Sequence, residues 1–549
     1  MGDGARGKDA EAWRVALGWA LPDRLPEAAE CTVRPLLERW ARETPDKPFA
    51  LFEDGRQWTY AEALAEVRSA AAGLSALGVG HGDPVLNWLP NGADHLRLWL
   101  AANFIGAIHV PIATSAQAAE LDHVLRNSGA RVLAADRGLI GRIAGLELET
   151  LGTLLLFGDG PAPDLDISTI EGSALARHDE MPPRTAVDFC DIALIIYTSG
   201  TTGLPKGVRN PYAQFWTLAK AQNGYLGPDD RVMISTSLSH ISTASMVLAA
   251  LYANASLALF DRFSAGRFWD RVRATGATAL PGLGPAILAM LLKAPPRRDD
   301  RDNPLRIVNV RAPSDAVRAF AERFGVDYFA AFGMTEASCI TLSARNSAVE
   351  GSCGKARPGV EVRLVDTKDV EVPDGTIGEI VLRADLPWTL NAGYHRDPEA
   401  TLRAWRNGWF HTGDLATRDA EGNYFFHDRL KDCIRRRGEN ISSQEVEREA
   451  LAFPAVRNAA AVGVAGEFDD QEVLLIVEPM PGQAVDPAAL TGFIATRLSH
   501  FKVPRYICVR DELPRTTFGK VRKYQLLAEI DLAACWDRAG GDGGSMPRP

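Results

Sequence analysis

Apolar and polar residues follow two different periods along the first part of the chain. Apolar residues recur at helical spacing over 61–79, which predicts an amphipathic helix ending at a glycine, and over 95–107, which predicts a buried helix. Short apolar and β-branched runs at 83–90, 109–112 and 131–136 predict strands. Because strands that alternate with helices tend to pair in parallel, the pattern predicts an α/β fold built on doubly wound sheets.

The pattern changes after Gly354 and again after Lys431. Three β-rich segments with turn glycines predict a small distorted β-barrel: 360–366, 371–384 and 422–428. Beyond Lys431, alternating helices and strands predict a compact α+β unit, with helices at 443–456 and 487–501 and strands at 458–466 and 471–479. The charged stretch 293–304 predicts an exposed loop.

These changes divide the chain into four predicted parts. They are an N-terminal extension at 1–33, a large N-terminal domain at 34–430, a smaller C-terminal domain at 431–530 and a tail at 531–549.

Composition excludes several classes of protein. Of the 549 residues, 46% are apolar and 24% charged, as in ordinary globular proteins and unlike collagens or disordered chains. The formal net charge of −10 argues against a nucleic-acid partner. Seven cysteines without a CxxC pair predict free thiols, and no apolar run is long enough for a membrane span. With no signal peptide visible, we expect a cytoplasmic protein.

The strongest local motif is the run IALIIYTSGTTGLPKGV at 192–208. A buried apolar strand leads into a loop of glycines, hydroxyl residues and one lysine. Glycines let the backbone N–H groups form an anion-binding nest, and Lys206 adds a positive charge, as a polyphosphate requires. The loop is not a Walker A motif, because Lys206 lies between Pro205 and Gly207. Taken alone, such a loop is also compatible with a mobile turn.

The segment YTSGTTGLPKG resembles the phosphate loop of the adenylate-forming superfamily of acyl-CoA synthetases, peptide-synthetase adenylation domains and luciferases. Further segments resemble that family's motifs in the same order: AFGMTEAS at 331–338, GWFHTGDLATRDAEGNYFFHDRLKD at 408–432, RRGENISSQEVE at 436–447 and LPRTTFGKVRK at 513–523. The resemblance covers about 34–525. The motifs of the chain look most like those of the carnitine/crotonobetaine-CoA ligase subgroup.

The resemblance implies a nucleotide site in the N-terminal domain. The phosphate contacts would come from Thr198, Ser199, Gly200, Thr201, Thr202, Gly203 and Lys206. Glu336 and Thr201 would hold Mg²⁺, which prefers oxygen ligands, and Thr335 would reach the α-phosphate. Phe332 and Gly333 would contact adenine, and Asp414 and Arg429 the ribose. Without the motif, Glu336 would be interpreted as a solvated glutamate at a turn and Phe332 as a core aromatic. Asp414 and Arg429 would be interpreted as a loop-capping pair.

The C-terminal domain is expected to be mobile. By resemblance, Lys431 is its hinge, and Lys520 reaches the N-terminal site to stabilise charge on the α-phosphoryl group. Coenzyme A would be held by Arg435, Gly438, Glu439 and Asn440, within a basic patch at 435–437. Arg437 departs from the family's usual Gly-Gly-Glu-Asn. Outside the motif, Lys520 would be a surface lysine and the patch a solvated face; Lys523 is a competing candidate for the catalytic lysine.

The acyl pocket is the least specific part of the resemblance. His240 would line and close the acyl tunnel, or serve as an ordinary buried histidine. The expected pocket residues are Ser242, Thr243, Met246, Arg311, Ala330 and Ala331. Arg311 departs from the family's Gly-Ala-Pro turn and either contacts a second polar group of the acid or points to solvent.

The sequence thus predicts an AMP-forming acid–thiol ligase that uses ATP, Mg²⁺ and coenzyme A on a small carboxylic acid. Three alternatives stay open: a stand-alone adenylation enzyme that loads a carrier protein, a luciferase-like oxidative activity, and a catalytically silent adenylate-binding homologue. A homodimer is also left open.

Overall fold

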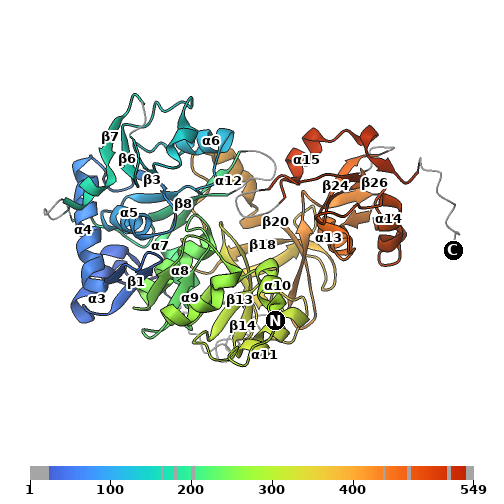
Figure 1. The fold of residues 1–549 in the computed structure, drawn as a ribbon, viewed down its shortest axis with the longest axis horizontal. Coiled ribbons are helices and arrows are strands. Elements are labelled where there is room, and N and C mark those ends of the chain that lie inside the picture. Colours follow the sequence, from blue (N-terminus) through green and yellow to red (C-terminus); the bar gives the residue numbers. More distant parts are fainter. Residues whose placement is uncertain are drawn as a thin grey trace.

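The computed structural model describes residues 24–161, 165–177, 182, 184–198, 204–436, 439–466, 471–515 and 521–539, without the side chains of Ala118, Glu439 and Asn440. A large body holds two sheets with their helices, and a smaller lobe follows at the C-terminal end (Figure 1). No helix in these ranges is both long and apolar enough to cross a membrane.

The two large sheets are mainly parallel, which confirms the predicted doubly wound α/β fold. The nine-stranded sheet runs, in spatial order, β16 (Lys355–Ala356), β15 (Ser338–Leu342), β14 (Asp327–Met334), β13 (Ile307–Val310), β12 (Ala279–Leu283), β10 (Arg231–Ile234), β11 (Ser256–Leu259), β1 (Pro48–Phe52) and β2 (Gln57–Thr59). The seven-stranded sheet runs β7 (Ser168–Glu171), β6 (Thr153–Phe157), β5 (Val132–Asp136), β3 (Pro84–Trp88), β4 (Ile108–Pro111), β8 (Ile192–Thr198) and β9 (Lys206–Pro211).

Helices cover these sheets and begin where the sequence supplies caps. The α-helices of the large body are α2 (Ala28–Cys31), α3 (Val33–Glu43), α4 (Tyr60–Ala76), α5 (Ala93–Phe104), α6 (Ala118–Ser128), α7 (Tyr212–Ala221), α8 (Ile241–Tyr252), α9 (Phe268–Thr275), α10 (Pro285–Lys293), α11 (Asp315–Phe324) and α12 (Pro398–Ala404). In α4, Thr59 and Glu62 form a reciprocal capping box, which explains why this predicted helix starts there.

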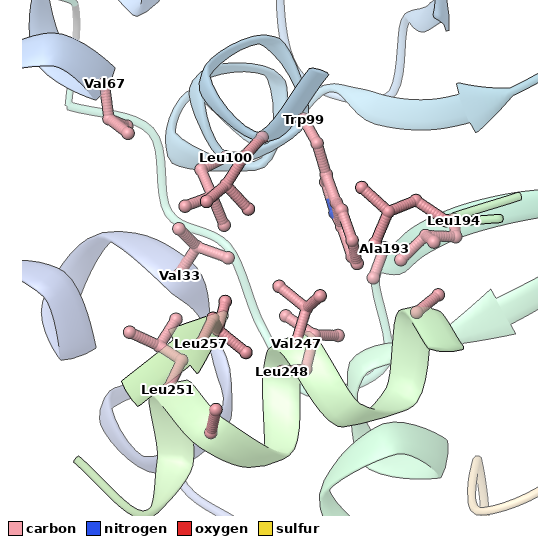
Figure 2. Packing of buried hydrophobic residues seen from close by; sticks show 14 of the residues in the cluster. Val33, Val67, Trp99, Leu100, Ala193, Leu194, Val247, Leu248, Leu251 and Leu257 are labelled. Carbon is pink, nitrogen blue, oxygen red and sulfur yellow. The ribbon is translucent and has the colours of Figure 1, made fainter. Parts of the chain in front are cut away.

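The largest hydrophobic core lies between the two sheets. Figure 2 shows Trp99 of α5 and Leu194 of β8 facing Val247 and Leu248 of α8, and all four side chains are buried. Cys31 packs in the same core, so α2 belongs to this body although it lies in the predicted extension. The core fixes the sheets relative to each other and hence the loops at their edges.

The β-rich region forms a five-stranded antiparallel sheet of β17 (Val360–Val365), β18 (Gly378–Ala384), β20 (Trp409–Arg418) and β19 (Trp405–Arg406), with β21 (Tyr424–Arg429) paired to β20. The smaller lobe contains the hairpin β22 (Ile434–Arg436) and β23 (Glu439–Ile441). It also holds β24 (Val456–Ala465), β25 (Gln471–Pro479), β26 (Tyr506–Val509) and β27 (Trp536–Asp537), with helices α13 (Ser443–Leu451), α14 (Pro487–Ala495) and α15 (Lys523–Glu529).

Three local predictions differ from the structure. Helix α14 ends at Ala495, before the predicted end at 501. Helix α13 ends at Leu451, short of the predicted end, because Pro454 lacks an N–H donor and disfavours helical geometry in the residue before it. In the charged loop 293–304, Asp300 is buried: it accepts a hydrogen bond from Arg323 Nε at 2.7 Å. That ion pair anchors the loop to α11, which composition alone did not reveal.

Candidate active site

The phosphate-loop motif forms the hairpin between β8 and β9. Thr198 and Lys206 are Cα partners in the antiparallel register, so the loop starts and closes at this pair. The predicted phosphate contacts Ser199, Gly200, Thr201, Thr202 and Gly203 lie outside the described residues. The Lys206 ammonium is 4.9 Å from the ring centroid of Tyr394, a cation–π distance that keeps the charge at the mouth of the loop.

Glu336 lies in the turn between β14 and β15, on the facing sheet. Its side chain is buried, and the Tyr394 hydroxyl donates to its Oε1 at 2.9 Å. Burial raises the pKa of Glu336, whereas Tyr394, Arg429 and Lys206 act to lower it. A carboxylate removed from water in this way gains from a hard cation, so the side chain fits a magnesium ligand.

Buried amides hold the turn that carries Glu336. Asn210 Nδ2 and Gln214 Nε2 donate to the carbonyl of Thr335 at 2.9 and 3.2 Å, and Gln214 also donates to Ser338 Oγ at 2.8 Å. Ser338 adopts a left-handed φ of 58°, and a Cβ on Gly333 would lie 1.7 Å from its carbonyl oxygen. The turn is thus tightly constrained, and Gly333 is required by this close approach.

The predicted ribose-binding pair lies on neighbouring strands. Asp414 of β20 and Arg429 of β21 are Cα partners, and Arg429 Nε is 3.3 Å from Asp414 Oδ1. Gly413, at φ 69°, donates its N–H to Glu379 Oε1 at 3.0 Å, and His411 Nδ1 is 3.0 Å from Glu379 Oε2. The buried carboxylate of Glu379 therefore supports the backbone that presents Asp414.

Lys431, the predicted hinge residue, lies within electrostatic range of this pair. Burial lowers the pKa of Lys431 to about 8; Arg429 and Lys206 add to this effect, and Asp432 and Asp414 oppose it. The charge of Lys431 therefore interacts with the residues predicted to bind the nucleotide and with Asp432, at the start of the C-terminal domain.

Phe332 packs against Phe426, with ring centroids 5.3 Å apart and planes at 34°. Phe332 stays half-buried, so part of its ring remains accessible for stacking. The sequence motif indicated Phe332 but not its partner.

The predicted acyl-pocket residues lie directly after β13, within β14 and in α8 with its N-cap. His240 is the N-cap of α8, and its Nδ1 accepts from the Ser242 N–H at 3.2 Å. The Thr243 hydroxyl is 2.8 Å from the Thr236 hydroxyl, so it is already engaged. The side chains of Thr243, Met246 and Ala330 are buried, Ala331 is half-buried, and Ser242 and Arg311 are exposed. Within the described ranges, Arg311 forms no ion pair.

The C-terminal candidates divide into described and undescribed residues. Gly438 and Lys520 lie outside the described residues, as do the side chains of Glu439 and Asn440 in β23. Arg435 is exposed, whereas Arg436 is buried and paired with Glu472 at 2.7 Å. The basic patch is therefore not uniformly available to phosphates, and Arg436 has a structural role.

Lys523, the competing candidate for the catalytic lysine, is engaged inside its own domain. Its Nζ lies 2.7 Å from Glu447 Oε1 and contacts the hydroxyl of Ser443. Ser443 in turn donates to the buried carboxylate of Asp428 at 2.7 Å. A lysine held in this way fixes the segment that follows Lys520.

Tyr394, Gln214 and Asn391 are site residues that sequence reasoning missed. Asn391 donates its backbone N–H and Nδ2 to the Glu336 carbonyl, each at 2.9 Å. The strand-like segment around Tyr394 pairs with Val208, next to the phosphate hairpin. Asn391 and Tyr394 precede Pro398 by a few positions in a region without regular secondary structure, whereas Gln214 lies in α7. Only their polarity marked them in the sequence.

This geometry is typical of an enzyme that uses a nucleotide. It combines a phosphate hairpin, a buried carboxylate suited to a metal ion and an Asp–Arg pair suited to a ribose. The sequence profile of the AMP-binding enzyme family matches residues 37–395, and that of the AMP-binding enzyme C-terminal domain matches residues 445–520. The chain belongs to the AMP-binding enzyme family.

Named relatives agree with this assignment over nearly the whole chain. A sulfoacetate–CoA ligase of Cupriavidus necator is 33% identical, over 90% of this chain and 97% of the relative. A crotonobetaine/carnitine–CoA ligase of Salmonella typhi is 29% identical, over 88% and 96%. The structure of o-succinylbenzoate CoA synthetase from Bacillus subtilis, in complex with ATP and magnesium ion, superimposes with a TM-score of 0.78 at 25% identity, covering 90% of this chain and 99% of that one.

Proposed function

We propose that the residues gathered around Glu336 carry out the first step of an acyl-CoA ligation, in which a carboxylate attacks the α-phosphorus of ATP. The protein is an ATP-dependent acyl-CoA ligase that releases pyrophosphate, forms an acyl-AMP and passes the acyl group to coenzyme A. The observation that carries the residue assignment is the contact of Tyr394 with both Lys206 and Glu336. Tyr394 thereby connects Lys206, which we propose contacts phosphate, with Glu336, which we propose holds the metal ion. The two residues lie at different sheets.

In the first step, Lys206 neutralises the phosphates and Asp414 accepts the ribose hydroxyls. Phe332 stacks on adenine, and Thr335 donates to the α-phosphate. Glu336 would hold Mg²⁺, which would neutralise part of the phosphate charge. Lys520 adds a further positive charge where charge develops on the transferred group, which lowers the barrier.

In the second step, the C-terminal domain turns about Lys431 and presents coenzyme A through Arg435 and the backbone near Gly438. The thiolate then attacks the acyl carbonyl and forms a carbon–sulfur bond. The bond between the acyl carbon and the phosphate oxygen breaks, and AMP leaves with that oxygen. The exposure of Arg435 supports this role, whereas the buried Arg436 leaves the patch smaller than its sequence indicates.

For the acyl substrate we propose a small carboxylic acid with a second polar or charged group. Arg311, exposed at the end of β13 and outside any ion pair among the described residues, supports this substrate class. Sulfoacetate, the acid in the name of one relative, has that chemistry. Pocket residues Ser242, Thr243, Met246, Ala330 and Ala331 are proposed on the family pattern. A homodimer and a cytoplasmic location stay predictions.

The deciding experiment measures pyrophosphate release from ATP over a panel of acids, with and without coenzyme A. Sulfoacetate, crotonobetaine, ferulate and unsubstituted short acids form the panel. We expect thioester formation that depends on coenzyme A. Pyrophosphate exchange without any thioester would favour carrier-protein loading, and no cleavage with any acid would favour a silent homologue. Arg311→Leu separates the acid classes, because only acids with a second anionic group lose turnover.

A further inference from the structure

Helix α6 backs the phosphate hairpin on the side that faces the C-terminal lobe. His123 Nε2 lies 3.0 Å from the carbonyl of Pro205, and the Tyr197 hydroxyl donates to Asn127 Oδ1 at 2.7 Å. In Figure 1, α6 and α12 lie at the edge of the large body nearest to α15. A side chain of the C-terminal lobe that binds to α6 is therefore held at a fixed position relative to the phosphate hairpin.

A residue of the C-terminal lobe makes such a contact. Arg522 Nη2 lies 3.2 Å from Glu120 Oε2 of α6, although the two residues are 402 positions apart in the chain. Their side chains are 29% and 27% exposed, so the pair is half-buried between the two parts. Partial burial weakens screening by salt and strengthens the attraction relative to an exposed pair.

The same segment is tied to its own domain. Arg522 donates its N–H to the carbonyl of Pro514 at 2.8 Å, Arg515 and Val521 form an antiparallel bridge, and Lys523 pairs with Glu447 at 2.7 Å. Lys520 lies between these anchors in sequence, two residues before Arg522. The contact of Arg522 with α6 thus fixes the residues that directly follow Lys520 in the sequence relative to the phosphate hairpin.

We propose that Glu120 and Arg522 form a docking contact that holds the C-terminal domain in the orientation for acyl-AMP formation. Glu120 is then a positioning residue for the first half-reaction and has no part in the second. This inference rests on the proposed function, because it assumes that Lys520 serves one half-reaction and that the domain turns before the other. A single pair that keeps part of its surface in contact with water also suits a contact that must break in every catalytic cycle, because ion pairs near the surface contribute little net stability.

The test uses full-length Glu120→Arg, Arg522→Glu and the double variant, with an acid that the wild-type enzyme activates. The first half-reaction is followed by pyrophosphate release, and the second by thioester formation from supplied acyl-AMP and coenzyme A. Loss of the attraction alone should lower the rate of acyl-AMP formation about two- to fivefold, which is the usual contribution of such pairs. The repulsion between the like charges that each single variant creates lowers this rate further. We expect each single variant to slow acyl-AMP formation at least fivefold while the second step keeps its rate. The double variant, which restores opposite charges, should recover most of the first step.

Glu149→Arg is the matched control, because Glu149 is an exposed glutamate of the same body and its reversal changes net charge equally. It should leave both steps unchanged. Equal losses in both half-reactions, a loss that the double variant does not repair, or wild-type rates in both single variants would each overturn the docking role. Failure of the proposed function is seen separately, because the wild-type protein would then release no pyrophosphate.

Discussion

The Tyr394 hydroxyl makes the contact on which the geometry of Glu336 most directly depends. Tyr394→Phe removes one oxygen, which donates to the buried carboxylate at 2.9 Å, and keeps the ring that faces the Lys206 ammonium. Hydrogen bonds to charged groups contribute about 1.5–3 kcal/mol, and losing the partner that orients a metal-binding side chain costs about 10–100-fold in metal affinity or activity. We expect the Mg²⁺ concentration for half-maximal pyrophosphate release to rise by a factor in that range.

The assay titrates Mg²⁺ at saturating ATP and acid, and calorimetry measures binding of Mg·ATP in the absence of acid. The pH dependence follows from the electrostatics. Burial raises the pKa of Glu336 and the Tyr394 hydroxyl opposes this rise, so its loss moves the pKa further up. Because a metal must then displace a proton, the defect should be larger near pH 6 than near pH 8.

Tyr328→Phe provides the control, because the Tyr328 hydroxyl donates at 2.9 Å to the carbonyl of Ser347 and has no contact with Glu336. Its Mg²⁺ requirement should match the wild type. The reasoning would be refuted if Tyr394→Phe kept the wild-type Mg²⁺ requirement at both pH values, or if the control shifted equally.

Four further outcomes are expected. Lys520→Ala should slow acyl-AMP formation by about 10²–10³-fold while thioester formation from supplied acyl-AMP survives; equal losses would contradict its role. Arg435→Ala should raise the KM for coenzyme A and spare pyrophosphate release, and an unchanged KM would remove it from the site. Because partial desolvation lowers the pKa of Lys431 to about 8, ATP binding should weaken above that pH in the wild type but not in Lys431→Met; parallel curves would argue against an electrostatic effect of Lys431 on the nucleotide site. Burial also lowers the pKa of His95 from 6.5 to about 4, so the unfolded chain takes up the proton first. The Tm should therefore fall as the pH drops below about 6.5, less steeply in His95→Gln, and a flat wild-type Tm would contradict this.

Much of the fold was predictable because local pattern and tertiary structure agree. The helix over 61–79 appears as α4 at Tyr60–Ala76, and the strand at 131–136 as β5 at Val132–Asp136. The predictions were less accurate where a contact distant in sequence decides the outcome. Asp300 is buried because Arg323 approaches it from α11, and no periodicity reports such a pair.

For the site, residue types in the sequence predicted a glycine-rich nest with one lysine, and the resemblance to a known family indicated Glu336 and Asp414. Only the tertiary structure decided which of them meet. Tyr394 contacts Glu336 from 58 positions away, and Arg522 contacts Glu120 from 402. Such contacts depend on how two sheets and a second domain pack together, and packing is a property of the whole chain that no local segment encodes.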